Sequence, residues 1–169
     1  METINGYTFG VVTMSDKGAR GEREDTSGHY LLKTLTDCGF RQVLYTVIPD
    51  ERTVIAETLV EAVDSNKISL IVTTGGTGLS PRDVTPEAMD DVLEKEIPGM
   101  AEAMRAASLK KTSRAMLSRG RVGVRGESLI INLPGSLKAV RENLEVVLPV
   151  ISHALEKIQG SDSDCGSAG

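Results

Sequence analysis

Tryptophan is absent from this chain of 169 residues, and its aromatic residues are only two Phe and three Tyr. Because proteins bind single-stranded nucleic acid largely by stacking bases on aromatic side chains, this scarcity argues against that class of function. An excess of positive charge is also missing, since the net charge is −5 and no general field attracts a polyanion. We therefore expect no nucleic-acid partner.

Long apolar segments are missing as well. No apolar run approaches the roughly 20 residues that span a bilayer. The first ten residues, METINGYTFG, have neither the basic nor the apolar region of a secretory signal. We therefore expect a cytoplasmic protein that does not enter a membrane.

Cysteine and histidine are scarce, with two residues of each (Cys38, Cys165, His29 and His153). None of them has the spacing of metal ligands, and a disulfide is not expected in the cytosol. This argues against a Cys/His zinc site and against a Cys–His catalytic pair.

Strand-like and helix-like patterns alternate in the first half of the chain. Apolar and β-branched runs predict strands at residues 7–14, 43–48 and 68–74. Helical periodicity predicts helices around Leu31–Leu35 and Ile55–Val63. This order predicts an α/β fold with a parallel sheet and right-handed crossovers.

The second half continues with helices and a hairpin. Thr85 and Pro86 are expected to be the N-cap and first residue of a helix. A second helix is expected from about Met100 to Lys110, after Pro98-Gly99 ends the first. Residues 121–125 and 128–133 then read as a β-hairpin.

A long amphipathic helix is predicted for residues 137–158, where apolar residues recur every three or four positions and Pro149 is a possible kink. The last residues, QGSDSDCGSAG, contain no aliphatic core residues apart from one Ala. We predict a single domain at residues 1–158 and a disordered tail at 159–169.

The ends of the predicted strands carry the candidate functional residues. In an open α/β sheet, ligands bind beyond the carboxyl ends of the strands. Each of these ends carries hydroxyl groups, glycines or a carboxylate, which together suit an anion bound with a metal. The segments are Thr13–Asp16, Pro49-Asp50, Thr73–Gly78 followed by Ser80–Asp83, and Asn132–Ser136.

Two of these segments are rich in glycine. The loop Gly75–Gly78 exposes successive N–H groups that suit a phosphate, although it matches neither the P-loop nor the GxGxxG pattern. The alternative is a tight strand-to-helix turn. Gly135 and Ser136 are expected at the start of the long helix, which favours an anion. The simpler alternative makes Ser136 an N-cap and Gly135 a turn residue.

Three carboxylates follow the strand ends: Asp16, Asp50 and Asp83. Two carboxylates are enough to hold Mg²⁺ against phosphate oxygens. The alternatives are a helix N-cap for Asp50, and an ion pair with Arg82 or a turn contact for Asp83. The three carboxylates beside two glycine-rich loops favour a site.

Positive charge is concentrated between Met100 and Gly126, where Glu102 is the only acid. Such a basic block in an acidic protein indicates a local site for a small anion, with a solvated helix face as the alternative. Within this block, the short loop with Ser118 and Arg119 is the better candidate for such a site, because it places a serine beside an arginine. The basic residues are Arg105, Lys110, Lys111, Arg114, Arg119, Arg121 and Arg125.

Taken together, six segments resemble the MogA and gephyrin G-domain family of molybdopterin adenylyltransferases, from about Tyr7 to Leu155. Six motifs in order at family spacing make the resemblance specific. They are Thr13–Asp16 (TMSD), Ile48–Glu51 (IPDE), Thr73–Gly78 with Pro81–Ala88 (TTGGTG and PRDVTPEA), Ile97–Met100 (IPGM), Met116–Arg119 (MLSR) and Ile130–Ser136 (IINLPGS).

The resemblance implies a three-layer α/β/α fold with a mostly parallel sheet, and a homotrimer. It also implies a nucleotidyltransferase reaction in molybdenum cofactor biosynthesis. AMP passes from Mg-ATP to the phosphate of molybdopterin, pyrophosphate leaves, and the product goes to a molybdenum insertase. ATP and molybdopterin are then the substrates and Mg²⁺ the cofactor.

The resemblance also assigns roles to single positions. Asp50 and Asp83 match the family's two key acidic positions and would serve catalysis and bind Mg²⁺. The other positions would bind the nucleotide or the pterin, with Ser118 and Arg119 beside the pterin. They are Ser15, Asp16, Thr74, Gly75, Gly76, Thr77, Gly78, Arg82, Ser118, Arg119, Asn132, Pro134, Gly135 and Ser136.

One departure and two alternatives accompany this resemblance. Family members often carry Asp-Arg-Ser-Gly where this chain has Asp25-Thr26-Ser27-Gly28, so any role of that arginine is lost or moved. The segment Asp25–Gly28 is interpreted most simply as a helix cap. The alternatives are a non-catalytic pterin carrier or scaffold, and a MoaB-like relative. The complete PRDVTPEA and NLPGS sequences favour the MogA branch.

Overall fold

The computed structural model describes residues 6–160 and contains a six-stranded sheet with the order β2-β1-β3-β6-β5-β4. Strands β2, β1, β3 and β6 are parallel, and β5 and β4 complete the sheet through antiparallel pairs. In chain order the elements are β1 (Thr8–Met14), α1 (Asp16–Ala19), α2 (Thr26–Asp37), β2 (Arg41–Ile48), α3 (Arg52–Val60), η1 (Glu61–Ser65), β3 (Leu70–Thr74), α4 (Thr85–Val92), β4 (Lys95–Glu96), α5 (Pro98–Leu109), η2 (Ser113–Leu117), β5 (Val122–Arg125), β6 (Ser128–Leu133) and α6 (Leu137–Ile158).

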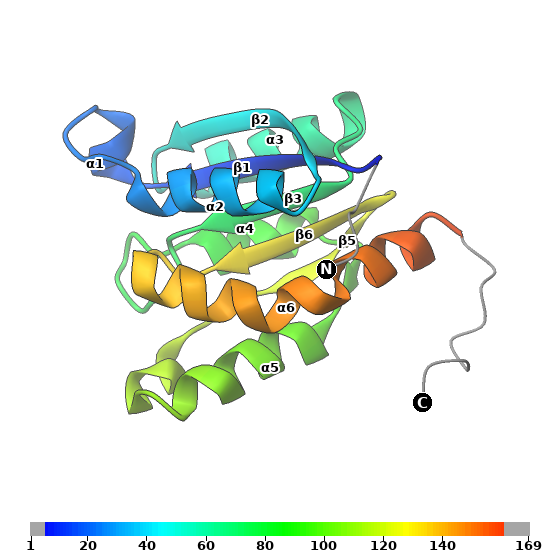
Figure 1. Cartoon of the computed structure of the whole chain (residues 1–169). Helices are drawn as coiled ribbons and strands as arrows, with labels where there is room; N and C mark the ends of the chain where they lie inside the picture. Colours follow the sequence, from blue (N-terminus) through cyan, green and yellow to red (C-terminus); the bar gives the residue numbers. More distant parts are fainter. Residues whose placement is uncertain (1–5, 161–169) are drawn as a thin grey trace.

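Helices cover both faces of the sheet, which confirms the three-layer α/β fold. Helices α2, α5 and α6 lie on one face, and α3 and α4 lie on the other (Figure 1). Each face has its own apolar core. The α2–α5–α6 side buries residues such as Leu31, Met104 and Leu144, and the α3–α4 side buries residues such as Ile55 and Met89.

Successive side chains along a strand point to alternate faces of the sheet, which explains why both cores form. In β6, the fully buried Ile130 belongs to the core under α3 and α4, while its neighbour Ile131 belongs to the opposite core. Successive strand residues point to opposite faces, so a nearly continuous apolar strand serves two layers. All five residues of β3, Leu70–Thr74, are buried for the same reason.

The structure corrects three local expectations. Helix α4 has Val84 rather than Thr85 at its N-cap, and no side chain caps it. Helix α5 begins at Pro98, not near Met100, because proline suits the first helical turn, where its missing N–H is not needed. The edge strand β4 and the short α1 and η2 were not predicted, since two to five residues carry too little periodicity.

The long helix α6 has the predicted bounds. The Ser136 hydroxyl caps it by accepting a hydrogen bond from Ala139 N, and the helix continues through Pro149. No helix within residues 6–160 combines the length and the apolar content needed for a membrane crossing. The predicted tail lies outside the described residues from position 161 onward, so the predicted domain and tail boundaries stay a prediction.

The topology places the carboxyl ends of four strands along one edge of the sheet. Near their ends, β1, β3 and β6 are in register at Thr13, Thr74 and Leu133, and β2 ends at Ile48 beside Met14, the last residue of β1. From β1 the chain crosses to β2, on one side of β1. The next strand, β3, lies on the other side of β1 and leads on to β6. This reversal is the switch point where α/β sheets bind ligands.

Candidate active site

A cavity of about 510 Å³ opens at this switch point. Its floor is formed where β1 and β3 end, and the N-termini of α2 and α6 complete its wall. The lining residues include Ser15, Asp50, Thr74, Gly75, Gly76, Asp83, Gly135 and Ser136 from the sequence prediction. The structure therefore brings together residues from four separate segments of the chain.

The glycine-rich loop after β3 passes close to its neighbours. Gly75 and Gly76 have φ angles of +103° and +64°, a region that disfavours residues with a side chain. A Cβ on Gly75 would overlap the carbonyl oxygen of Met14, and a Cβ on Gly76 would overlap Thr85 Oγ1. The loop therefore needs glycine at both positions, for conformation and for space.

The loop that precedes α6 packs against this glycine-rich loop. Thr74 Oγ1 donates a hydrogen bond of 2.6 Å to Pro134 O, and Ser27 Oγ donates one of 2.9 Å to Gly135 O. A Cβ on Gly135 would lie 3.4 Å from Gly75 Cα. These contacts fix the two glycine-rich loops against each other on one side of the cavity.

Asp50 is held by two reciprocal hydrogen bonds with Asp16, the first residue of α1. Its Oδ2 accepts a hydrogen bond of 2.9 Å from Asp16 N, and Asp50 N donates one of 3.0 Å to Asp16 Oδ1. Glu51, not Asp50, is the N-cap of α3, so the capping alternative is wrong. Asp50 Oδ1 is turned toward Gly76, since a Cβ there would lie 3.5 Å from it.

The surroundings of Asp50 oppose its ionisation. Burial raises the pKa of this carboxyl, and the charges of Asp16 and Asp83 add to that effect. The hydrogen bond from Asp16 N and the positive charge of Arg82 act in the opposite direction. A cation bound beside Asp50 would therefore relieve an unfavourable charge.

Asp16 and Arg82 form an exposed ion pair at the edge of the site. Arg82 Nε and Nη2 donate to the two oxygens of Asp16 at 2.9 and 2.7 Å. Arg82 therefore pairs with Asp16, and the proposed ion pair between Arg82 and Asp83 is wrong. Asp83 does make the alternative turn contact, because its Oδ2 accepts a hydrogen bond of 2.9 Å from Ser80 N.

Asp25 is a cavity residue that sequence reasoning treated only as a cap. Its Oδ1 does cap α2, by accepting from Gly28 N at 2.8 Å. Its Oδ2 also accepts from Thr13 Oγ1 at 2.6 Å and from Tyr45 Oη at 3.0 Å. Burial, followed by this hydrogen bond and the charge of Asp25, raises the pKa of Tyr45 to about 12.

A smaller cavity of about 260 Å³ lies on the other side of the glycine-rich loop. Of the predicted residues, Thr77, Gly78, Ser118 and Pro134 line it. The remaining wall comes from α5, η2 and the first turns of α6. Thr74–Gly76 and Thr77–Gly78 thus face two adjoining cavities, which gives one loop access to two ligands.

Four predicted residues lie outside both cavities, with side-chain bonds of their own. Asp16 and Arg82 pair with each other. Arg119 is bonded to Glu87, Gly78 O and Asp83 O, and it lines a separate surface hollow. Asn132 is fully buried and donates to Thr73 Oγ1 at 2.9 Å.

The expected basic block does not form one free anion site. Arg121 pairs with Asp90 and Glu96, and Arg125 pairs with Asp64. These acids lie far away in the sequence, so counting charges within the block could not reveal them. Arg114 differs, because it lines the smaller cavity with no side-chain partner among the described residues.

The residues fit Mg²⁺ only together with a substrate. Within residues 6–160 no cluster of three or more His, Cys, Asp or Glu side chains is arranged to hold a metal. Asp50 and Asp83 line the same cavity and act on each other electrostatically. Mg²⁺ commonly takes one or two carboxylates plus phosphate oxygens and water. Asp50 and Asp83 would supply the carboxylates, and the substrate would supply the phosphate oxygens.

Comparison with known proteins identifies the family. The family described as "Probable molybdopterin binding domain" matches residues 10–153. The chain belongs to this molybdopterin-binding family. The match extends from β1 through most of α6, so it includes every segment that lines the two cavities.

Individual relatives place the chain among the MogA and gephyrin G-domain members of the family. It is 42% identical to the molybdopterin adenylyltransferase of Helicobacter pylori, over 95% of this chain and 91% of that protein. It is 43% identical to gephyrin of Dictyostelium discoideum, over 88% of this chain but 22% of that longer protein.

A solved relative has the same fold. The molybdopterin biosynthesis enzyme MoaB of Thermus thermophilus is 49% identical, with a TM-score of 0.86 over 92% of this chain and 98% of its own. Relatives named for the adenylyltransferase and for MoaB are therefore both similar to this chain over most of its length.

Proposed function

We propose that this protein is a molybdopterin adenylyltransferase, which transfers AMP from ATP to the phosphate of molybdopterin and releases pyrophosphate. The observation that carries the proposal is the pair of carboxylates, Asp50 and Asp83, in the cavity beside the glycine-rich loop. Its relative in Helicobacter pylori carries the name of this activity at 42% identity.

The residues of the cavity suit this chemistry. The attacking group is a phosphate oxygen that is already ionised near neutral pH, so no Ser, Cys or His has to be activated. The reaction then depends on positioning and charge neutralisation. Asp50 and Asp83 would hold Mg²⁺, which would neutralise charge on the phosphates of ATP.

The two adjoining cavities suggest a division of the substrates. The larger cavity contains the carboxylates and Gly75-Gly76, which fits the nucleotide phosphates. The smaller cavity contains Ser118 and Pro134, and it fits the pterin. The loop Gly75–Gly78 would then align the phosphate of molybdopterin with the α-phosphate of ATP.

The remaining expectations belong to the same proposal. The enzyme would act in the cytoplasm as a homotrimer, and would pass the adenylylated pterin to a molybdenum insertase. The family resemblance supports both the trimer and the insertase.

Product analysis tests the proposed reaction. Purified protein is incubated with molybdopterin, ATP and Mg²⁺, and adenylylated pterin and pyrophosphate are measured. We expect equimolar products, and at least a roughly hundred-fold lower rate for Asp50→Asn, because the amide removes the charge that holds the cation. Asp91→Asn is the control, since Asp91 is paired with Arg52 outside both cavities.

Other outcomes would select another function. A folded Asp50→Asn variant with the normal rate would remove Asp50 from the mechanism. Binding of pterin while ATP stays intact would favour the carrier function. Transfer to a different acceptor in competition with molybdopterin would favour a distinct, MoaB-like specificity.

A further inference from the structure

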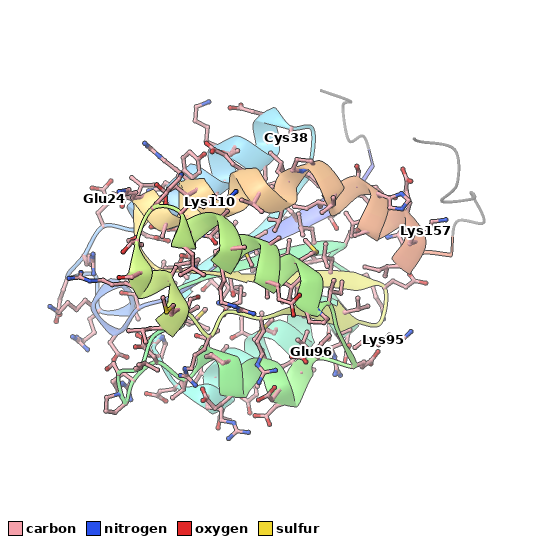
Figure 2. All side chains as sticks on the ribbon, turned by 90° about the horizontal axis from the view of Figure 1, so that it is seen from below. Glu24, Cys38, Lys95, Glu96, Lys110 and Lys157 are labelled. Atoms are coloured by element: carbon pink, nitrogen blue, oxygen red, sulfur yellow. The ribbon has the colours of Figure 1, made fainter. Side chains whose placement is uncertain are left out.

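Arg23 lies in the loop between α1 and α2 and contributes to the wall of the larger cavity. It is the only Lys or Arg among the described residues that line this cavity. Its neighbour Glu24 lies at the end of the molecule opposite Lys95 and Lys157 (Figure 2). Figure 1 shows the α1–α2 loop at the same end as the tips of the parallel strands.

The charge balance of the cavity gives Arg23 its importance. Four carboxylates line the wall, from Glu24, Asp25, Asp50 and Asp83. A nucleoside triphosphate is itself strongly negative, and two aspartates can be offset by one divalent cation. The repulsion that remains favours an additional positive group at the cavity wall.

Nearby arginines are already engaged. Arg82 is bonded to both oxygens of Asp16, and Arg20 is bonded to both oxygens of Glu22. The side chain of Arg23, in contrast, is exposed and has no hydrogen bond or ion pair with any described residue. Its guanidinium group is therefore available to a ligand.

Only three of the arginines have no side-chain hydrogen bond, ion pair or ring contact within the described part of the chain: Arg23, Arg41 and Arg114. Arg23 lines the larger cavity and Arg114 lines the smaller one. Arg41 is the first residue of β2, so it lies at the edge of the sheet opposite the cavities. Arg41 is thus a matched control for an exposed arginine that is remote from the site.

We propose that Arg23 binds the phosphate groups of the nucleoside triphosphate in the larger cavity and sets the affinity for that substrate. Its guanidinium N–H groups would donate hydrogen bonds to phosphate oxygens, for which a planar fork is well suited. Arg23 neither gives nor takes a proton in the transfer. This inference rests on the proposed adenylyltransferase function, because it assumes a nucleotide in this cavity.

Steady-state kinetics test the role of Arg23. The rate of pterin adenylylation is measured at saturating molybdopterin while Mg-ATP is varied, for wild type, Arg23→Ala, Arg23→Lys and Arg41→Ala. We expect kcat/KM for ATP to fall roughly ten-fold to hundred-fold in Arg23→Ala, the range for losing a hydrogen bond between charged groups. Arg23→Lys retains part of the activity, and Arg41→Ala matches wild type.

A binding measurement accompanies the kinetics and needs no turnover. Mg-ATP is titrated into each protein by calorimetry at low and at high salt. We expect weaker binding by Arg23→Ala and a smaller salt dependence than in wild type, because salt screens the charge attraction that the variant lacks. The KM for molybdopterin is expected to stay within two-fold of wild type.

Two results would overturn the inference. One is an Arg23→Ala variant with the ATP affinity and kcat/KM of Arg41→Ala. The other is a defect confined to molybdopterin, which would assign Arg23 to the other substrate. A wild-type protein that makes no adenylylated pterin contradicts the proposed function instead, and the Mg-ATP titration then still decides on Arg23.

Discussion

Asp50 and Asp83 illustrate how a single residue combines a structural contact with a place in the site. Each uses one carboxylate oxygen to bind a backbone N–H group, of Asp16 and of Ser80 respectively. Both also line the larger cavity. At the level of one residue, a turn contact and a functional role are compatible, so the two sequence interpretations of Asp83 were not exclusive.

A substitution at Gly76 tests whether the glycine-rich loop requires glycine at a single position. Gly76→Ala places a Cβ against Thr85 Oγ1 at a φ of +64°, so we expect a loss of about 2–4 kcal/mol in the free energy of unfolding. Urea denaturation measures this loss.

Gly21→Ala is the matched control for Gly76→Ala. Gly21 has a similar φ of +73° but nothing within 4 Å of an added Cβ, so about 1 kcal/mol of backbone strain is expected. Equal losses in the two variants would mean that the contact with Thr85 contributes nothing to the glycine requirement.

Among the elements, α2, β1 and β2 are joined at the cavity by the carboxylate of Asp25. The N-cap of α2 was predicted and is confirmed. The bonds from Thr13 in β1 and Tyr45 in β2 were not predicted, because they depend on which strands lie beside the helix. This one carboxylate therefore fixes the end of a helix relative to two strands.

Tyr45→Phe tests this connection through its dependence on alkaline pH. Folding raises the pKa of the Tyr45 hydroxyl from 10.0 to about 12, so the folded protein keeps a proton that the unfolded chain loses. The stabilisation is complete below a pH of about 10 and is lost as pH rises toward 12. Tyr45→Phe should therefore lose less stability than wild type over this range.

Urea denaturation from neutral pH to pH 12 measures the difference between the two proteins. Tyr30→Phe is the control, because Tyr30 contacts Arg141 through its ring rather than through a hydroxyl bond to a carboxylate. A Tyr45→Phe variant with the same alkaline slope as wild type would contradict the role of the Asp25 hydrogen bond.

Considered as a whole molecule, the protein has two cores that share one sheet. Ile130 and Ile131 are adjacent and fully buried, yet they belong to cores on opposite faces. Damage to either core must therefore disturb the strand that supports the other.

Two arginines of the basic block also connect distant parts of the molecule. Arg121, which precedes β5, forms ion pairs with acids of α4 and β4, and Arg125 at the end of β5 forms an ion pair with an acid of η1.

Ile130→Ala and Ile131→Ala test whether the two cores unfold together. We expect each variant to lose about 2–5 kcal/mol, the cost of truncating a fully buried large side chain. Both should keep one cooperative transition, seen equally by far-ultraviolet circular dichroism and by intrinsic tyrosine fluorescence. Val150→Ala is the control, since Val150 is 47% exposed and a change within about 0.5 kcal/mol is expected.

Separate transitions for the two probes in only one isoleucine variant would contradict this cooperativity. They would mean that one face of the sheet remains folded after the other has opened.

The sequence by itself determined the order of the main elements and the candidates at the strand ends. Periodicity and helix caps are local properties, so segments such as Arg41–Ile48 and Leu137–Ile158 were predicted almost to their observed bounds. The six family motifs likewise pointed to the family that the comparisons identify. The parallel sheet then placed Asp50, Gly75 and Ser136 at one edge, because all of them follow strand ends.

Only the tertiary structure decided which candidates share a cavity and which are occupied by neighbours. Arg82 is bonded to Asp16 and Arg119 to Glu87, whereas Arg23, which belongs to no motif, lines the larger cavity without a side-chain partner among residues 6–160. Such pairings join residues far apart in the sequence, so their distances depend on strand order and helix packing. The residue type determines which groups a side chain can bind, and the fold determines which of those groups lies within bonding distance.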